Sequence, residues 1–231
     1  MVGKLWKDDV RVLVAFDMDK TLIDCEILDE VAKEHGCFDE VAKITDEGMS
    51  GNLTFAESIG RRLMLLKGTH VNNFDKVFKE QPLTHGAGEL LLKLKEEGAK
   101  TAIITGGFDI IAYRLAKKLG IDYVACNKFD INNGMLTGNF ELKVDGNKDY
   151  WLDVFKKESG ANVVVAVGDG ANDIPMIKTA DFGVAYRAKE CLRGIADINV
   201  ENIFDVYGLL NDLFDSSQRT CVNTSIELIS E

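Results

Sequence analysis

The sequence has few of the side chains that bind zinc or form disulfides. It contains three histidines, which are widely spaced, and five cysteines without a single CxxC pair. Structural zinc sites need Cys and His ligands at short paired spacings, so this pattern argues against zinc. An odd number of unpaired cysteines is typical of reduced thiols, and we expect a cytoplasmic protein.

The chain also lacks a long apolar run and an excess of positive charge. No apolar stretch approaches the ~20 residues needed to span a bilayer, and the N-terminal MVGKLWKDD has no signal-peptide core. There are 38 acidic and 27 basic residues, a formal net charge of −11. Nucleic acid and anionic membranes repel such a protein. We expect neither as a partner, and both a monomer and a homodimer remain open.

Two acidic residues follow the first strongly apolar segment of the chain. Residues 12–16 are continuously apolar, as in a strand that is buried on both faces, and Asp17 and Asp19 come directly after them. If the backbone stays extended, both carboxylates point to the same side. Two carboxylates that must repel each other need positive charge between them, and a divalent cation with a phosphate group is the natural candidate.

The spacing of apolar residues divides the chain into two regions. Helical periodicity dominates residues 22–85, whereas apolar strands alternate with helices from residue 87 to 214. This alternation predicts an α/β fold with a mainly parallel sheet. We expect a discontinuous core domain (1–21 and 86–214), a helical cap domain inserted at 22–85, and a loosely ordered tail at 215–231. Asn133-Gly134 predicts a small β-hairpin within 128–142.

Two further strands end in residues suited to phosphate and metal. Thr105-Gly106-Gly107 ends one strand, and Gly168-Asp169-Gly170-Ala171-Asn172-Asp173 ends another. Adjacent parallel strands would bring these ends to Asp17 and Asp19. Oxygen ligands alone favour Mg²⁺ over zinc. Taken separately, both segments can be read as simple glycine turns, and Lys148 as a solvated surface charge. Beside the other strand ends, Lys148 could pair with phosphate oxygens.

In chain order these residues resemble the four motifs of the haloacid dehalogenase superfamily. Four stretches are similar to the phosphoserine phosphatase branch of this superfamily. They are FDMDKTLIDCEILDEVA, MSGNLTFAESIGRRLMLLKG, GGFDIIAYRLAKKLG and GDGANDIPMIKTADFGVAYRAKECLR. The resemblance covers about residues 11–200. It implies a HAD-like Rossmannoid core with an inserted all-helical cap.

The resemblance implies a role for each matching residue. Asp17 would be the nucleophile that forms an aspartyl-phosphate, and Asp19 the general acid and base. Magnesium would be held by Asp17, the backbone carbonyl of Asp19, and Asp169. Asp173 and Asn172 would orient the groups around the metal and Lys148. The phosphate would be bound by Thr105, Gly106 and Lys148.

The resemblance also implies a substrate. Glu26 would bind the ammonium group of phosphoserine and Arg62 its carboxylate, and Met49 and Phe55 would exclude water. The predicted reaction is hydrolysis of O-phosphoserine to serine and phosphate, the last step of serine biosynthesis. Thr105 in place of the usual Ser, and Lys20 in place of a small residue, leave room for another small phosphorylated carboxylate or for phosphate transfer to homoserine.

Two alternatives of other classes also arise from the sequence. A phosphate-binding protein without turnover is disfavoured because Asp17 and Asp19 are both present. The DxD site of a glycosyltransferase explains neither Lys148 nor GDGAND.

Overall fold

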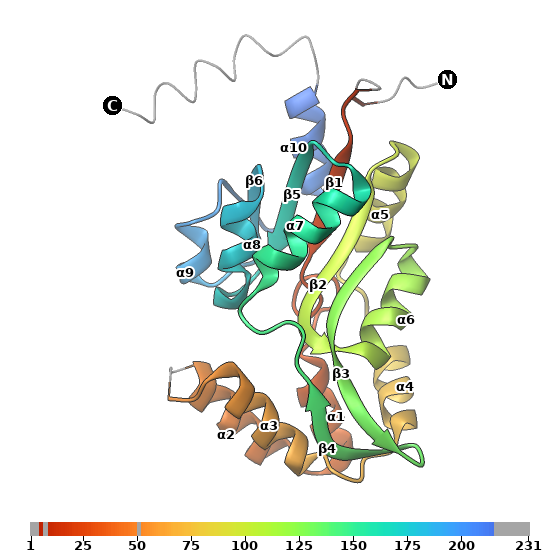
Figure 1. Ribbon diagram of the computed structural model, residues 1–231, viewed down its shortest axis with the longest axis vertical. Coiled ribbons are helices and arrows are strands. Elements are labelled where there is room, and N and C mark those ends of the chain that lie inside the picture. The colour runs from red at the N-terminus through yellow and green to blue at the C-terminus, as the bar shows by residue number, and fades with distance from the viewer. Residues whose placement is uncertain (1–4, 7–8, 50–51, 215–231) are drawn as a thin grey trace.

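The centre of the protein is one seven-stranded sheet, seen in a computed structural model that describes residues 5–6, 9–49 and 52–214. The strand order is β4-β3-β2-β1-β5-β6-β7 (Figure 1). The strands are β1 (Val12–Phe16), β2 (Lys100–Phe108), β3 (Tyr123–Asn132), β4 (Met135–Glu141), β5 (Val163–Gly168), β6 (Phe182–Tyr186) and β7 (Ile198–Val200). All pairs are parallel except β3 with β4. The predicted fold class is confirmed.

Strand β1 lies in the middle because all five of its residues are apolar and buried. It pairs with β2 on one side and β5 on the other. Val14 and its neighbours at alternate positions pack on one face, and Leu13 and Ala15 on the other, as the two-residue period of a strand requires.

Helices cover both faces of this sheet. The first face packs against α5 (Ala87–Glu96), α6 (Asp109–Leu119) and α10 (Asp205–Phe214). The other packs against α7 (Lys148–Ser159) and α8 (Ile174–Thr179). A short 3₁₀ turn (Ala171–Asp173) precedes α8, and α9 (Glu190–Arg193) follows β6.

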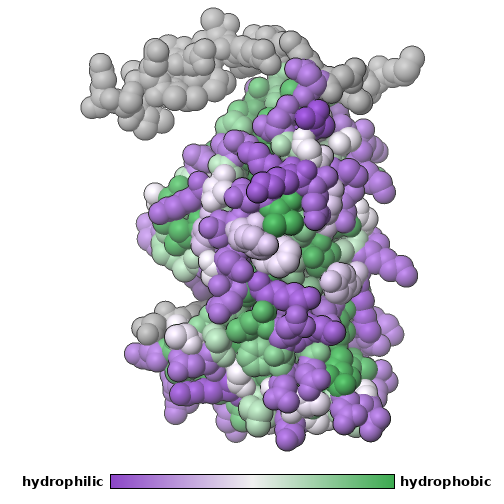
Figure 2. Space-filling model, in the orientation of Figure 1, coloured by the Kyte–Doolittle hydropathy of each residue, from purple (hydrophilic) through white to green (hydrophobic). Residues whose placement is uncertain are grey.

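Four helices connect β1 to α5 and lie beyond the carboxyl ends of the strands (Figure 1). They are α1 (Ile27–His35), α2 (Phe38–Met49), α3 (Phe55–Leu65) and α4 (Val71–Glu80). Helix α1 ends at Gly36, whose φ of 81° suits a glycine and whose N–H donates to the Ala32 and Lys33 carbonyls. The surface narrows between this helical layer and the α/β layer (Figure 2).

The predicted hairpin is part of the main sheet and not a separate element. Strand β3 pairs with β2 at its start and with β4 at its end, so one long strand replaces the predicted strand and hairpin arm. The hairpin reaches the helical layer, where Gly68 N–H donates to Leu136 O (2.8 Å) and Leu136 N–H to Thr69 O (2.9 Å).

One prediction concerns a part of the chain that has no structural description. The tail 215–231 lies outside the described residues, so its order stays a prediction. Among the helices of the described ranges, none combines the length and the apolar character needed to cross a membrane.

Candidate active site

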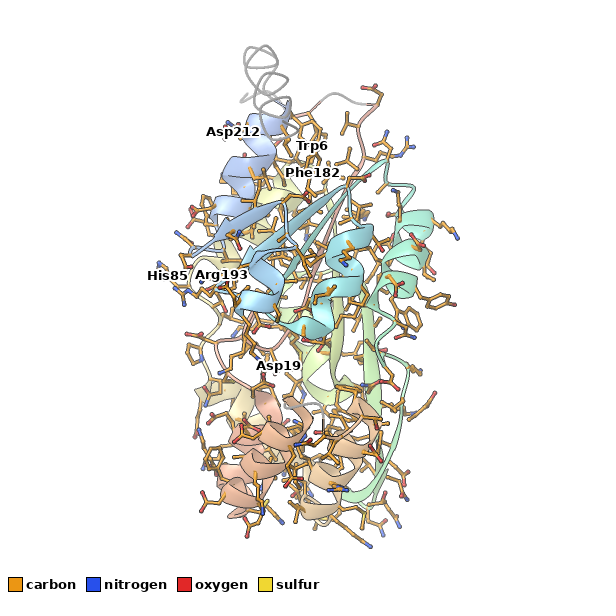
Figure 3. The ribbon with its side chains drawn as sticks, turned by 90° about the vertical axis from the view of Figure 1, so that its left-hand side faces the viewer. Trp6, Asp19, His85, Phe182, Arg193 and Asp212 are labelled. Carbon is orange, nitrogen blue, oxygen red and sulfur yellow. The ribbon has the colours of Figure 1, made fainter. Side chains whose placement is uncertain are left out.

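The neighbouring strands β2, β1 and β5 end at one place, beneath the helical layer. Asp17 directly follows β1, and its backbone N–H donates to Val167 O at the end of β5 (3.0 Å). Asp19 lies at the junction of the two layers (Figure 3). The predicted meeting of the three strand ends is therefore observed.

Lys148 is buried between two carboxylates. Its Nζ lies 2.7 Å from Asp17 Oδ1 and 2.6 Å from Asp173 Oδ1, and only 2% of its side chain is exposed. Lys148 is the first residue of α7, far from β1 and β5 in sequence. The packing of α7 on the sheet brings the ammonium group to the strand ends.

The pKa values of Lys148 and Asp17 are both shifted in this arrangement. Burial alone would lower the pKa of Lys148, but the Asp17 and Asp173 carboxylates raise it above its usual value. Burial and the Asp173 charge raise the pKa of Asp17 to about 7, although Lys148 acts in the opposite direction. Two carboxylates thus share one ammonium group, which leaves the site one positive charge short.

Asp19 is held by the start of α1. Its Oδ1 accepts a hydrogen bond from the Ile27 N–H (3.0 Å). Burial, followed by the charges of Glu26 and Asp17, raises the pKa of Asp19 well above the usual range. A carboxyl group in this environment tends to keep its proton.

The last part of β2, residues 105–107, is an irregular segment beside Asp19 where the register with β3 shifts, and we call it the phosphate loop. Thr105 is buried, and its Oγ1 accepts a hydrogen bond from the Gly107 N–H (2.8 Å). A Cβ on Gly107 would lie 3.0 Å from Asp19 Oδ2 and closer still to the Met18 side chain. The glycine is therefore needed for space at this point, and the loop is pressed against the Asp17–Asp19 segment.

Asn127 holds this loop by hydrogen bonds, a role that sequence reasoning did not predict. Its Nδ2 donates to Gly106 O (2.9 Å) and Val144 O (3.2 Å), while its Oδ1 accepts from the Lys143 and Val144 N–H groups (2.8 and 2.9 Å). It is fully buried in β3. The available signal was a polar residue at the end of an apolar strand.

Three carboxylates are close enough to share a cation. One oxygen from each of Asp17, Asp169 and Asp173 lies within 4.8 Å of the others. Burial and the Asp173 charge raise the pKa of Asp169 to about 6. All donors are oxygens, which fits a hard divalent cation. The Asp173 oxygens already have partners, since Oδ1 pairs with Lys148 and Oδ2 accepts from the Asp169 and Gly170 N–H groups (3.0 Å each).

The helical layer contributes a second charged group. Glu26 precedes α1, and Arg62 lies on α3, and both line the pocket above Asp17. Burial lowers the pKa of Arg62, and the charges of Glu26 and Asp29 oppose this change. Arg62 Nε donates to Ser58 O (3.4 Å). The predicted pair is thus brought to one side of the pocket.

The remaining predicted residues differ in how they are placed. Phe55 lines the pocket and contacts the loop at Gly106. Asn172 is an exposed residue that also lines the pocket. Met49 is the last residue of α2, and its side chain lies outside the described residues.

Most of these groups line one pocket of about 300 Å³, although Lys148, Asp173 and Asn127 are not among its described lining residues. Its floor contains Asp17, Asp19, Thr105 and Asp169, and its roof contains Glu26, Phe55 and Arg62. Thr45, Ser58 and Lys189 also line it and were not predicted. The fold and this pocket together define an α/β protein with a carboxylate-rich site at the carboxyl ends of its parallel strands.

Comparison with known proteins agrees with this arrangement. A family model described as haloacid dehalogenase-like hydrolase matches residues 14–178. A phosphoserine phosphatase of Methanocaldococcus jannaschii is 42% identical over 83% of this chain and 92% of its own length. One of Archaeoglobus fulgidus is 42% identical over 86% of this chain, which spans only 59% of that protein. A solved phospho-aspartyl intermediate analogue of phosphoserine phosphatase has a TM-score of 0.81 and 39% identity, covering 87% of this chain and 99% of that one.

The chain belongs to the haloacid dehalogenase-like hydrolase family.

Proposed function

We propose that this protein is a Mg²⁺-dependent phosphoserine phosphatase, and that residues 22–85 are a cap domain over a core formed by 1–21 and 86–214. The observation that carries the proposal is the buried Lys148 ammonium between Asp17 and Asp173, at the strand ends where Asp169 also lies. The similarity to phosphoserine phosphatases over most of the chain supports the choice of substrate.

Asp17 is the nucleophile in this proposal. Its carboxylate attacks phosphorus, the bond from phosphorus to the ester oxygen breaks, and an aspartyl-phosphate forms. Lys148 favours the ionised form of Asp17, because it lowers the pKa that burial has raised. Asp17 and Asp169, with the backbone carbonyl of Asp19, would hold Mg²⁺, which would neutralise charge on the phosphate.

Asp19 moves the proton. Its raised pKa favours the protonated form, which donates its proton to the serine oxygen as that oxygen leaves. The ionised carboxylate then takes a proton from the water that attacks the aspartyl-phosphate, which releases phosphate and restores Asp17. Thr105, Gly106 and Lys148 would bind the phosphate oxygens throughout.

Glu26 and Arg62 would select the substrate. A phosphorylated amino acid carries an ammonium and a carboxylate, which match these two side chains in charge. Phe55 contacts Gly106 and so covers the phosphate loop, which excludes water from the reacting atoms. Met49 would exclude water together with Phe55, and Asn172 would lie beside the bound phosphate.

The test is phosphate release from phosphoserine, phosphothreonine, phosphoglycolate and p-nitrophenyl phosphate, each with Mg²⁺ and with EDTA. We expect Mg²⁺-dependent turnover with kcat/KM for phosphoserine at least ~100-fold higher than for the others, about 2.7 kcal/mol of transition-state preference. Metal-dependent turnover without preference would retain the phosphatase and refute the roles of Glu26 and Arg62. A parallel reaction that contains homoserine tests whether phosphate is transferred to an alcohol instead of to water.

Arg62→Ala tests the carboxylate contact directly. Loss of one charge-assisted hydrogen-bonded contact should raise KM for phosphoserine roughly 10- to 1000-fold, on the order of 1.5–4 kcal/mol. Turnover of p-nitrophenyl phosphate, which has no carboxylate, should change little. The matched control is Arg61→Ala, because Arg61 is exposed and lies 3.6 Å from Glu47 instead of in the pocket.

A further inference from the structure

The segment that follows β6 also reaches the catalytic pocket, and it carries a lysine there. Strands β5 and β6 are parallel, and Ala185 of β6 is level with Gly168, the last residue of β5. The chain then passes Asp169, whose backbone O accepts a hydrogen bond from the Lys189 N–H (2.9 Å). The exposed Lys189 lines the pocket together with Asp169 and Glu26. It is therefore anchored beside the reaction centre, at an edge of the pocket that meets solvent.

The backbone around Lys189 is held by its neighbours. Arg193 Nε donates to Ala188 O (2.7 Å), and Arg193 Nη2 lies 2.9 Å from a Glu201 carboxylate oxygen. The Leu192 N–H donates to Lys189 O (2.9 Å) where α9 begins. Side chains of a binding site are positioned by such supporting contacts. The origin of the Lys189 side chain is thus fixed relative to the pocket.

The Lys189 charge acts at the end of the pocket where Glu26 lies. Burial and the Asp29 charge raise the pKa of Glu26, and Lys189 is one of the cations that oppose this rise. Burial also raises the pKa of Asp169, and Lys189 opposes this rise more than Lys148 does. Lys148 is itself buried. One ammonium group is therefore buried at the floor of the site, and a second, exposed one lies near Asp169 and Glu26.

Arg62 lies at the same end of the pocket, but it comes from the helical layer. It is part of α3 and lines the pocket with Lys189 and Glu26. Its Nε donates to Ser58 O (3.4 Å), and a guanidinium has two further nitrogens that can bind a carboxylate. Two cations, one from each layer, therefore border the pocket near a single carboxylate.

The three charged groups of a phosphorylated amino acid differ in how well they suit Lys189. The phosphate already has Lys148, the phosphate loop and Mg²⁺ in the proposed site. The ammonium would be repelled by a second ammonium, whereas it suits Glu26. The carboxylate is attracted, and its two oxygens, with about four lone-pair sites, can accept hydrogen bonds from two cations at once.

We propose that Lys189 is a specificity-determining residue that binds the carboxylate of the substrate together with Arg62. The carboxylate then lies between a cation of the helical layer and a cation of the α/β layer, and it joins the two layers over the bound ester. This inference rests on the proposed function and extends it. The substrate class is that of small phosphate esters with a carboxylate, and the substrate ammonium is bound by Glu26.

Three phosphate esters separate the groups that Lys189 can bind. Phosphoserine has a carboxylate and an ammonium, phosphoglycolate has only the carboxylate, and phosphoethanolamine has only the ammonium. With saturating Mg²⁺ at low ionic strength, Lys189→Gln should lower kcat/KM at least ~5-fold for the first two, mainly through KM, as expected for a charged contact at the exposed edge of a site. For phosphoethanolamine the change should be below ~2-fold, because no carboxylate is lost.

Two further variants distinguish a lost contact from a general effect. Lys189→Arg retains the positive charge and should keep most of the activity on phosphoserine. Lys178→Gln is the matched control, since Lys178 is exposed on α8 and is not among the residues that line the pocket. It should leave kcat/KM unchanged for all three esters. The Mg²⁺ concentration for half-maximal turnover should be the same in Lys189→Gln as in the unsubstituted protein.

The outcomes separate this proposal from the proposed function. An equal loss for all three esters, a weaker response to Mg²⁺, or no loss for any ester overturns the role of Lys189. Turnover of phosphoglycolate but not of phosphoserine refutes the proposed function, and Lys189 is then judged on phosphoglycolate against phosphoethanolamine. If the unsubstituted protein hydrolyses none of the three, the proposed function also fails. Calorimetric titration must then show tighter binding of phosphoglycolate than of phosphoethanolamine, and Lys189→Gln must lose this preference.

Discussion

Phe55 of α3 lies directly against Gly106 at the end of β2. A Cβ built on Gly106 would come 2.9 Å from Cζ of the Phe55 ring, closer than real Cβ contacts allow. The helical layer and the phosphate loop therefore touch at a glycine, where the loop has no side chain.

Gly106→Ala should consequently impair closure more than folding. The ring is the far end of a movable side chain, so Phe55 should be displaced and KM for phosphoserine should rise about tenfold or more, roughly 1.4 kcal/mol. The double variant Gly106→Ala/Phe55→Leu should recover part of the loss. Gly88→Ala is the control, since nothing lies within 4 Å of a Cβ there. Steady-state kinetics that do not distinguish the two glycine variants would contradict the contact.

Lys148→Met should destabilise the protein and abolish turnover. Removal of one member of a buried ion cluster leaves the Asp17 and Asp173 carboxylates uncompensated, at a cost of roughly 3–5 kcal/mol. The loss should depend on pH. Without Lys148 the pKa of Asp17 rises further above its unfolded value, so the stabilising proton is present at low pH and is lost as pH rises.

Urea unfolding with EDTA at about pH 5 and about pH 8 measures this effect. The stability deficit of Lys148→Met relative to the unsubstituted protein should be clearly smaller at the lower pH. A deficit that does not change with pH would mean that lost packing, and not charge, causes it. Lys157→Met, an exposed lysine on the same helix, is the control.

Asn127→Ala should lower both stability and kcat/KM. It removes four hydrogen bonds that join Gly106, Lys143 and Val144, each worth about 1 kcal/mol, so we expect a loss of about 2–4 kcal/mol. Because Gly106 is released, turnover should fall for all phosphate esters alike. Asn139→Ala, on the exposed side of β4, is the control. Loss of stability with unchanged kcat/KM would show that Asn127 does not position the phosphate loop.

Mg²⁺ affinity should increase as pH rises from about 5 to about 8. Protons must leave Asp17 and Asp169, whose pKa values are raised to about 7 and about 6, before their oxygens can hold a cation. Calorimetry in buffers of different ionisation enthalpy should record proton release near pH 6. Asp169→Asn should bind Mg²⁺ much more weakly and release fewer protons. Affinity that is independent of pH would contradict this set of ligands.

Much of the fold could be predicted because local patterns determined it. The apolar run at 12–16 has no polar position that could face water, so it had to become a central strand. The ends of helices and strands could not be predicted where tertiary contacts override the local pattern of apolar residues. Helix α1 begins only at Ile27, because Asp19 accepts a hydrogen bond from its N–H. Strand β3 continues into the hairpin because β2 and β4 both pair with it.

The sequence by itself determined which chemical groups the site contains: the acids after β1 and β5, the small residues after β2, and the helical stretch above them. Only the tertiary structure decided how these groups share charge. Lys148 could be recognised as a candidate, but its burial between Asp17 and Asp173 depends on how α7 packs against the sheet. The hydrogen bonds of Asn127 to Gly106, Lys143 and Val144 likewise join residues that are distant in the chain. The local spacing of apolar residues shows which face of each segment is buried. Which charged groups become partners depends on distances that exist only in the folded protein.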